Sequence, residues 1–108
     1  MSYHPIKLDK VRNFKYGMKA IDLIEKKYKK PIMEIEGITN GIMTMEDYAT
    51  LIWAGLVHED DKLTPEKVMD LVDEYSNIRE VSKVMWEALN DVFKVDDEEV
   101  ETEEKNKK

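Results

Sequence analysis

The stretch TMEDYATLIWAGLVHEDDKLTPEKVMDLVDEYS, residues 44–76, sets the architecture of this chain. From Tyr48 to Val57 it carries no charged side chain, and its apolar residues cover more than one face of a helix. Such a helix is stable in water only when other elements cover it. We therefore predict a central helix over residues 44–58, surrounded by the other helices. Gly55 would weaken this helix by up to about 1 kcal/mol relative to alanine, so we expect a close helix crossing there.

Start signals mark both helices of this stretch. Thr44 with Asp47 three residues later makes a capping pair, and Thr64 with Pro65 places a cap and a proline where a helix begins. The second helix, residues 64–75, then has the i, i+3, i+4, i+7 spacing of an amphipathic helix at Val68, Leu71, Val72 and Tyr75. The two helices and the acidic loop between them are predicted to form an αα-hairpin.

One further helix is predicted on each side of this hairpin. The first covers residues 16–29 and ends before Pro31; its apolar stripe consists of Met18, Ile21, Ile24 and Tyr28. The last covers residues 77–94 and begins with the capping pair Asn77 and Glu80. Its apolar face holds Ile78, Val81, Met85, Ala88, Leu89 and Val92.

The remaining segments have less regular patterns. Short alternations of apolar and polar residues in residues 3–16 fit a pair of strands, with an extended arm as the alternative. In residues 32–43, Gly37 and Asn40–Gly41 interrupt an apolar link, to which we assign no conformation. Residues 95–108 are a block of like charges that cannot bury enough apolar surface to fold, and we predict that this tail is disordered.

The composition fits one small domain. The chain has 108 residues, of which 42% are apolar and 38% are charged, and this allows one modest core. We predict a mainly α domain of about four helices in residues 1–94, with a short N-terminal β-hairpin or arm. The net charge is −7, and residues 95–108 contribute −4 of it through seven acids and three lysines.

The charge and the absence of certain residues exclude several function classes. An acidic protein repels phosphate backbones, and residues 65–75 expose mainly acids, so nucleic acid is not an expected partner. There is no cysteine for disulfide or thiolate chemistry. No apolar run approaches the roughly 18 residues of a membrane span, and the N-terminus lacks a hydrophobic signal core. We expect a soluble protein that stays in the compartment where it is made, without a membrane partner.

Residues for catalysis or metal binding are few. His4 and His58 are the only imidazoles, and Ser82 lacks a nucleophile elbow or glycine-rich loop. The acidic loop does not fit an EF-hand, because a ligand loop that began at Asp60 would have Pro65 where glycine belongs. We therefore predict no catalytic, cofactor-binding or metal site, and no enzyme.

A protein-binding surface is the remaining candidate. Seven methionines and two tryptophans are many for a chain of this size. Methionine adapts to irregular partners, and tryptophan is enriched at binding hot spots. The predicted partner-binding surface lies on the last helix, at Met85, Trp86, Leu89 and Phe93. An alternative stays open, in which the methionines at helical spacing fill the core together with Trp53; these are Met18, Met69 and Met85.

Several segments resemble the tail assembly chaperones of long-tailed, siphovirus-like bacteriophages and prophages. They are the helical run Ala20–Glu25, the segment Trp53-Ala54-Gly55-Leu56, the acidic loop Glu59–Lys62 and the helix start Leu63–Glu66. The resemblance covers residues 5–94 and consists of helix signals, not of catalytic residues.

The resemblance implies a non-enzymatic protein of the host bacterial cytoplasm that is absent from the mature virion. Such chaperones coat the tape measure protein and keep it soluble while tail tube subunits polymerise around it. Many are made in two lengths by a programmed ribosomal frameshift, and the longer form is thought to recruit the tube protein; this chain would be the short form. Coating a long partner also suggests a homo-oligomer. The alternative function is a generic acidic helical adaptor or regulator that binds one protein.

Overall fold

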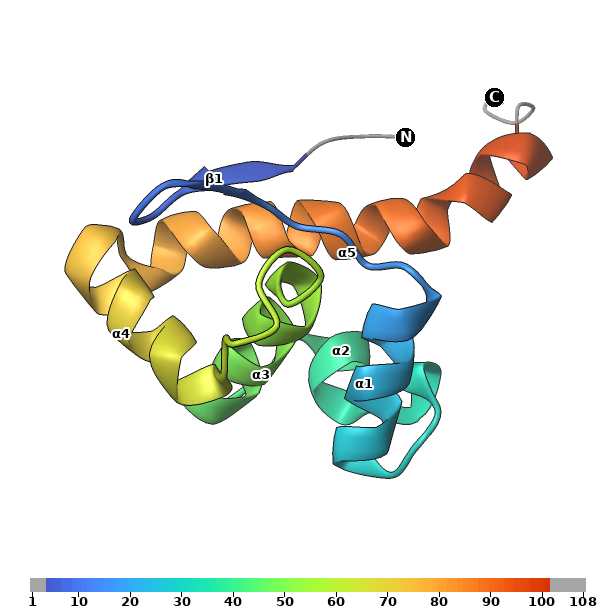
Figure 1. The fold of residues 1–108 in the computed structure, drawn as a ribbon. Coiled ribbons are helices and arrows are strands. Elements are labelled where there is room, and N and C mark those ends of the chain that lie inside the picture. The colour runs from blue at the N-terminus through green and yellow to red at the C-terminus, as the bar shows by residue number, and fades with distance from the viewer. Residues whose placement is uncertain (1–3, 102–108) are drawn as a thin grey trace.

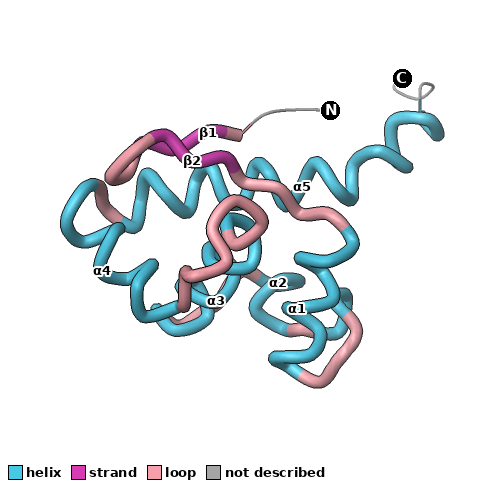
Figure 2. The backbone as a smooth tube through the Cα atoms, in the orientation of Figure 1, coloured by secondary structure: helices cyan, strands magenta, loops and turns pink. Residues whose placement is uncertain are grey.

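Helices make up most of the chain. The computed structural model describes residues 4–101, and it describes side chains for residues 4–93. A two-stranded hairpin, the short 3-10 helix η1 and five α-helices follow one another within the described residues (Figures 1 and 2). In chain order they are β1 (Pro5–Lys7), β2 (Val11–Asn13), α1 (Met18–Tyr28), η1 (Ile32–Glu34), α2 (Glu36–Asn40), α3 (Met45–Leu56), α4 (Pro65–Tyr75) and α5 (Ile78–Glu101). The predicted fold class is confirmed.

The central helix is α3, as the sequence predicted. It contacts α1, α4, α5 and β2, and Figure 1 shows it between α4 and α1, alongside α5. Seven of its twelve residues are buried, from Ala49 to Leu56 with the exception of Trp53. Trp53 is half-buried, and its indole N–H donates a hydrogen bond to the carbonyl oxygen of Leu63 at 2.9 Å. An apolar helix in this position gives the domain its core.

The predicted starts of α3, α4 and α5 are confirmed, whereas α1 begins at Met18 and not at residue 16. Thr44 accepts a hydrogen bond from the backbone N–H of Asp47 at 3.0 Å, and the Asp47 carboxylate accepts one from the Thr44 N–H at 3.1 Å. Thr64 accepts from the backbone N–H of Lys67 at 3.1 Å, and Asn77 accepts from the N–H of Glu80 at 2.9 Å. These side chains satisfy amides that a helix end would otherwise leave free.

Gly55 allows a close approach, but the expected helix crossing is wrong. The segment that follows the hairpin lies against it: a Cβ atom at Gly55 would be 2.7 Å from Phe14 Cδ1 and 2.6 Å from Tyr16 Cζ. Tyr16 is buried and donates a hydrogen bond to the carbonyl oxygen of Leu51 at 2.6 Å. The backbone N–H of Lys15 donates to the Gly55 carbonyl at 2.8 Å. Two aromatic rings therefore occupy the space that a side chain at position 55 would need.

The buried face of α1 differs from the predicted stripe at its first residue. Met18 is 91% exposed, whereas Ala20 and Ile24 are buried. Met18 is the first helical residue, and the chain reaches it directly from Tyr16, whose ring already fills the adjacent part of the core. The helix ends with Lys29 in the left-handed conformation, at φ 58°.

The N-terminal segment forms the hairpin, not the extended arm. Its strands are antiparallel with Ile6 opposite Arg12, and β1 lies against α5 while β2 lies against α3. The segment before α3, which had no assigned conformation, contains η1 and α2. The expected break at Gly37 is wrong: this glycine lies inside α2, where a Cβ would be 2.8 Å from Met43 Cγ. The break comes at Gly41, whose φ of 79° favours glycine.

The last helix is longer than predicted. We predicted an end at residue 94 and a disordered tail over residues 95–108, but the backbone of α5 is helical as far as Glu101. This stretch has neither glycine nor proline, so nothing in it breaks a helix that has already started. The rest of the predicted tail, residues 102–108, lies outside the described residues.

Candidate functional site

The predicted partner-binding surface on α5 is corrected by the structure. Met85 and Leu89 are completely buried, so a partner cannot reach them while the fold is intact. Trp86 and Phe93 are half-buried and pack against the same core. Helix α5 lies against α3, α4 and β1, and Met85 and Leu89 belong to the core that these elements share. The four residues therefore do not form one exposed face.

A different apolar surface is open to solvent, at the groove between α3, α4 and the start of α5. The groove has a volume of about 180 Å³. Three of its large apolar residues are exposed: Met45 at 56%, Met69 at 37% and Ile78 at 36%. We call it the α3–α4 groove, and its lining consists of Met45, Tyr48, Ala49, Ile52, Val68, Met69, Val72, Asp73 and Ile78.

The sequence builds this groove from two capped helix starts and the side of α4. Met45 and Ile78 are the first residues of α3 and α5, directly after the caps Thr44 and Asn77. Side chains in a first turn have no preceding turn of their own helix to pack on, so they extend over the neighbouring element. Met69 borders the buried residue Val68 on α4. Helical spacing left Met69 open between core and interface and gave no signal for Met45, because only the relative positions of the helices bring these residues together.

The surface beside the groove is acidic. Helix α4 carries Glu66, Asp70, Asp73 and Glu74 against the single cation Lys67, and all five are exposed. Asp73 also lines the groove. An apolar groove that is lined by one acid, on a helix that carries three more, suits an apolar ligand that carries positive charge.

A second cavity, of about 340 Å³, lies between α1, α2 and the start of α3. Its main polar contact is a hydrogen bond that the Tyr28 hydroxyl donates to Asp47 Oδ1 at 2.6 Å. Burial and this hydrogen bond raise the pKa of Tyr28. Burial alone would raise the pKa of Asp47, but hydrogen bonds from Tyr28 and Thr44 outweigh it and lower the pKa. The Asp47 carboxylate accepts from both Tyr28 on α1 and the Thr44 N–H at the start of α3, so this contact fixes α1 against the cap of α3.

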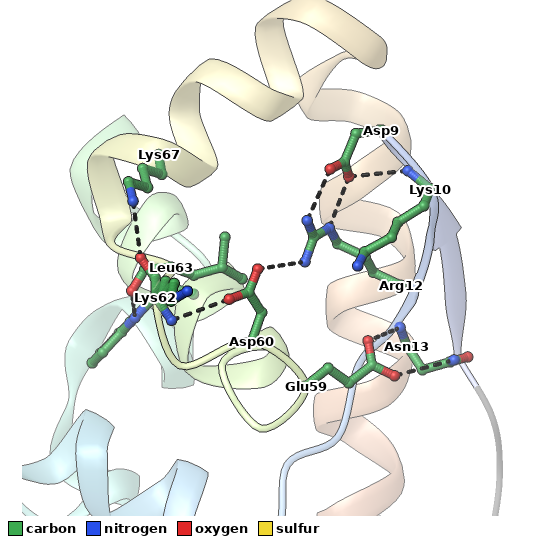
Figure 3. Close-up of polar contacts among 10 residues, drawn as sticks. Asp9, Lys10, Arg12, Asn13, Glu59, Asp60, Lys62, Leu63 and Lys67 are labelled. Atoms are coloured by element: carbon green, nitrogen blue, oxygen red, sulfur yellow. Dashed lines mark hydrogen bonds and ion pairs between the residues drawn. The ribbon is translucent and has the colours of Figure 1, made fainter.

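The acidic loop holds the hairpin through polar contacts (Figure 3). Arg12 is 4% exposed, and its guanidinium donates to both carboxylate oxygens of Asp9 at 2.9 Å. It also reaches Asp60 in the loop at 3.5 Å. Glu59 accepts from the backbone N–H of Asn13 at 3.1 Å. Within the described residues, no group of three or more histidine or acidic side chains could hold a metal ion.

The residues considered for catalysis have separate partners. His58 Nε2 lies 2.8 Å from the carbonyl oxygen of Asn13, and His4 Nε2 lies 2.8 Å from Asp91 Oδ2. The Ser82 hydroxyl donates to the carbonyl oxygen of Arg79 at 3.2 Å. These contacts attach the hairpin to the loop and to α5 and keep Ser82 on its own helix.

Comparisons with known proteins identify no family for this chain. No protein-family model matches it, and no curated protein or solved structure matches it. In the part of the chain that the structure describes, no helix has the length and apolar character of a membrane span.

Proposed function

We propose that the protein is a phage tail assembly chaperone that binds another polypeptide and transforms no substrate. In this proposal it binds the tape measure protein in the host bacterial cytoplasm, keeps it soluble and helps to recruit tail tube subunits during tail assembly. The assignment to phage tails comes from the sequence resemblance of segments such as Ala20–Glu25 and Leu63–Glu66.

The observation that carries the proposal is the α3–α4 groove. It leaves Met45, Met69 and Ile78 exposed on a protein with a net charge of −7. A tape measure protein presents long apolar helical stripes that aggregate unless they are covered. Adaptable methionine side chains can cover stripes of varied shape, and the negative charge of the bound chaperone keeps the complex dispersed.

The test is co-expression with the tape measure protein from the same gene cluster. The groove variant Met45→Gln/Met69→Gln replaces two exposed groove residues with polar residues of similar length. The control variant Met18→Gln/Met33→Gln changes two methionines that are 91% and 58% exposed elsewhere. We expect the groove variant to bind the tape measure protein about tenfold more weakly, or ~1.4 kcal/mol, and therefore to leave less of it soluble. The control variant should match wild type.

Two results would contradict the proposal. The first is equal solubility of the tape measure protein with wild type and with the groove variant, provided that both fold. The second is a gene neighbourhood without tail tube and tape measure genes. In that case, a groove that still bound one partner would indicate a generic acidic adaptor.

A further inference from the structure

The walls of the α3–α4 groove determine the backbone conformation of what can bind there. They come from α3, α4 and the first turn of α5, and the hydrogen-bonding groups of these helices are largely satisfied within each helix. An extended peptide needs a strand edge with a row of free N–H and C=O groups, and these walls contain no strand. A helical ligand satisfies its own backbone groups and needs only side-chain contacts.

The size of the groove limits what enters it. A volume of about 180 Å³ accepts large apolar side chains but not a whole helix. A helix that lies over the groove must therefore present its anchors on one stripe, at i, i+3 or i+4 and i+7. The exposed methionines Met45 and Met69 stand on opposite walls, where they can close over those anchors.

The charge around the groove determines what flanks that stripe. Besides the four acids of α4, the exposed Glu46 follows Met45 and the exposed Glu80 follows Ile78 by two residues. Lys67 and Arg79 are the cations on these same segments. Lysine and arginine extend their aliphatic stems along apolar surface while their charged ends reach solvent, which is where these carboxylates lie.

We infer that the α3–α4 groove binds an amphipathic helix whose apolar stripe is flanked by lysine or arginine. This inference deepens the proposed function and rests on it, since it names the part of the partner that the groove recognises. It predicts that the groove selects a partner segment by its charge as well as by its apolar stripe. Acidic helical segments should therefore bind weakly.

The experiment uses two synthetic helical peptides with one apolar stripe, flanked by lysines in the first peptide and by glutamates in the second. Binding of each labelled peptide to the full-length protein is measured by fluorescence anisotropy at low and high salt. We expect the lysine-flanked peptide to bind at least about tenfold more tightly at low salt, with a smaller difference at high salt because ions screen exposed charges.

A charge variant tests whether α4 supplies the selectivity. Asp70→Asn/Asp73→Asn keeps the side-chain shapes and should reduce the preference for the lysine-flanked peptide several-fold, whereas Glu87→Gln, an exposed acid on α5, should not. The inference would be overturned by equal affinity for the two peptides, or by a preference that the charge variant leaves unchanged. Neither outcome would affect the co-expression result for the tape measure protein. Failure of both peptides to bind would overturn helix docking in the groove, and co-expression would decide the proposed function separately.

Discussion

Gly55 shows how one missing side chain sets the position of two segments. Its Cα faces the rings of Phe14 and Tyr16, and ordinary van der Waals contact would require roughly 1 Å more room than the 2.6 and 2.7 Å that a Cβ would have. We predict that Gly55→Ala lowers the free energy of unfolding by about 1–3 kcal/mol, because overpacking outweighs the gain in helix propensity. Urea denaturation followed by circular dichroism measures this difference.

Gly17→Ala is the matched control for that prediction. A Cβ at Gly17 would meet only Lys15 Cε, at 3.7 Å, and its backbone at φ −90° accepts any residue. Because Gly17 is the N-cap of α1 and alanine caps a helix less well than glycine, this variant should lose only about 0.5 kcal/mol, less than Gly55→Ala. A Gly55→Ala protein as stable as wild type would show that the two rings can move aside.

At the residue scale, the sequence predicted that Gly55 allows a close approach but not which residues make it. The special role of Gly55 could be predicted because glycine is costly inside a helix. The rings that contact it could not, because Phe14 and Tyr16 lie about 40 residues away and no local pattern links them to α3. Met85 and Leu89 were assigned to an exposed surface, since periodicity shows which residues share a face but not which element covers that face.

At the element scale, the hairpin depends on ionised carboxylates. Hydrogen bonds from the Arg12 guanidinium lower the pKa of Asp9, and the Lys62 backbone N–H together with Arg12 lowers that of Asp60. A carboxyl group whose pKa is lower in the folded state stabilises the fold above its unfolded pKa, about 3.9 for aspartate. That stabilisation is lost as the pH falls through the lower, folded pKa. The contacts of Arg12 should therefore weaken in acid.

We predict that Asp9→Asn destabilises the protein near neutral pH and that its difference from wild type shrinks below about pH 4. The reason is that below about pH 3.9 the unfolded wild-type carboxyl gains a proton that the paired, folded carboxyl does not, and the stabilisation is lost completely once the folded carboxyl is protonated as well. Urea unfolding at about pH 7 and about pH 3 gives both differences. Asp61→Asn, an exposed aspartate of the same loop, is the control. A difference for Asp9→Asn that is the same at both pH values would exclude this role of the ion pair.

The starts of elements were predictable, and their ends less so. Thr44, Thr64 and Asn77 mark helix starts through side chains that act on the next three residues, so local sequence is sufficient. The end of α5 was placed at residue 94 from composition alone, although the segment up to Glu101 contains no residue that stops a helix. The α3–α4 groove needs the mutual placement of three helices, which no single helix pattern contains.

At the scale of the whole molecule, the central helix α3 has two roles. Its buried residues, among them Leu51, Ile52 and Leu56, hold α1, α4 and α5 together. Its first turn, with Met45, stays open to solvent beside α4. The protein can therefore present apolar surface to a partner without exposing its own core, which is the property that the proposed function requires.

Photo-crosslinking tests the central claim, that this groove contacts the partner polypeptide, most directly. A photoreactive phenylalanine analogue replaces Met45 in one sample and Met18 in another, and both proteins are co-expressed with the tape measure protein. Both positions are exposed first residues of a helix, but only Met45 lines the groove. We predict crosslinks to the tape measure protein from position 45 and not from position 18. Crosslinks of equal yield from both positions, or none from position 45, would contradict the account.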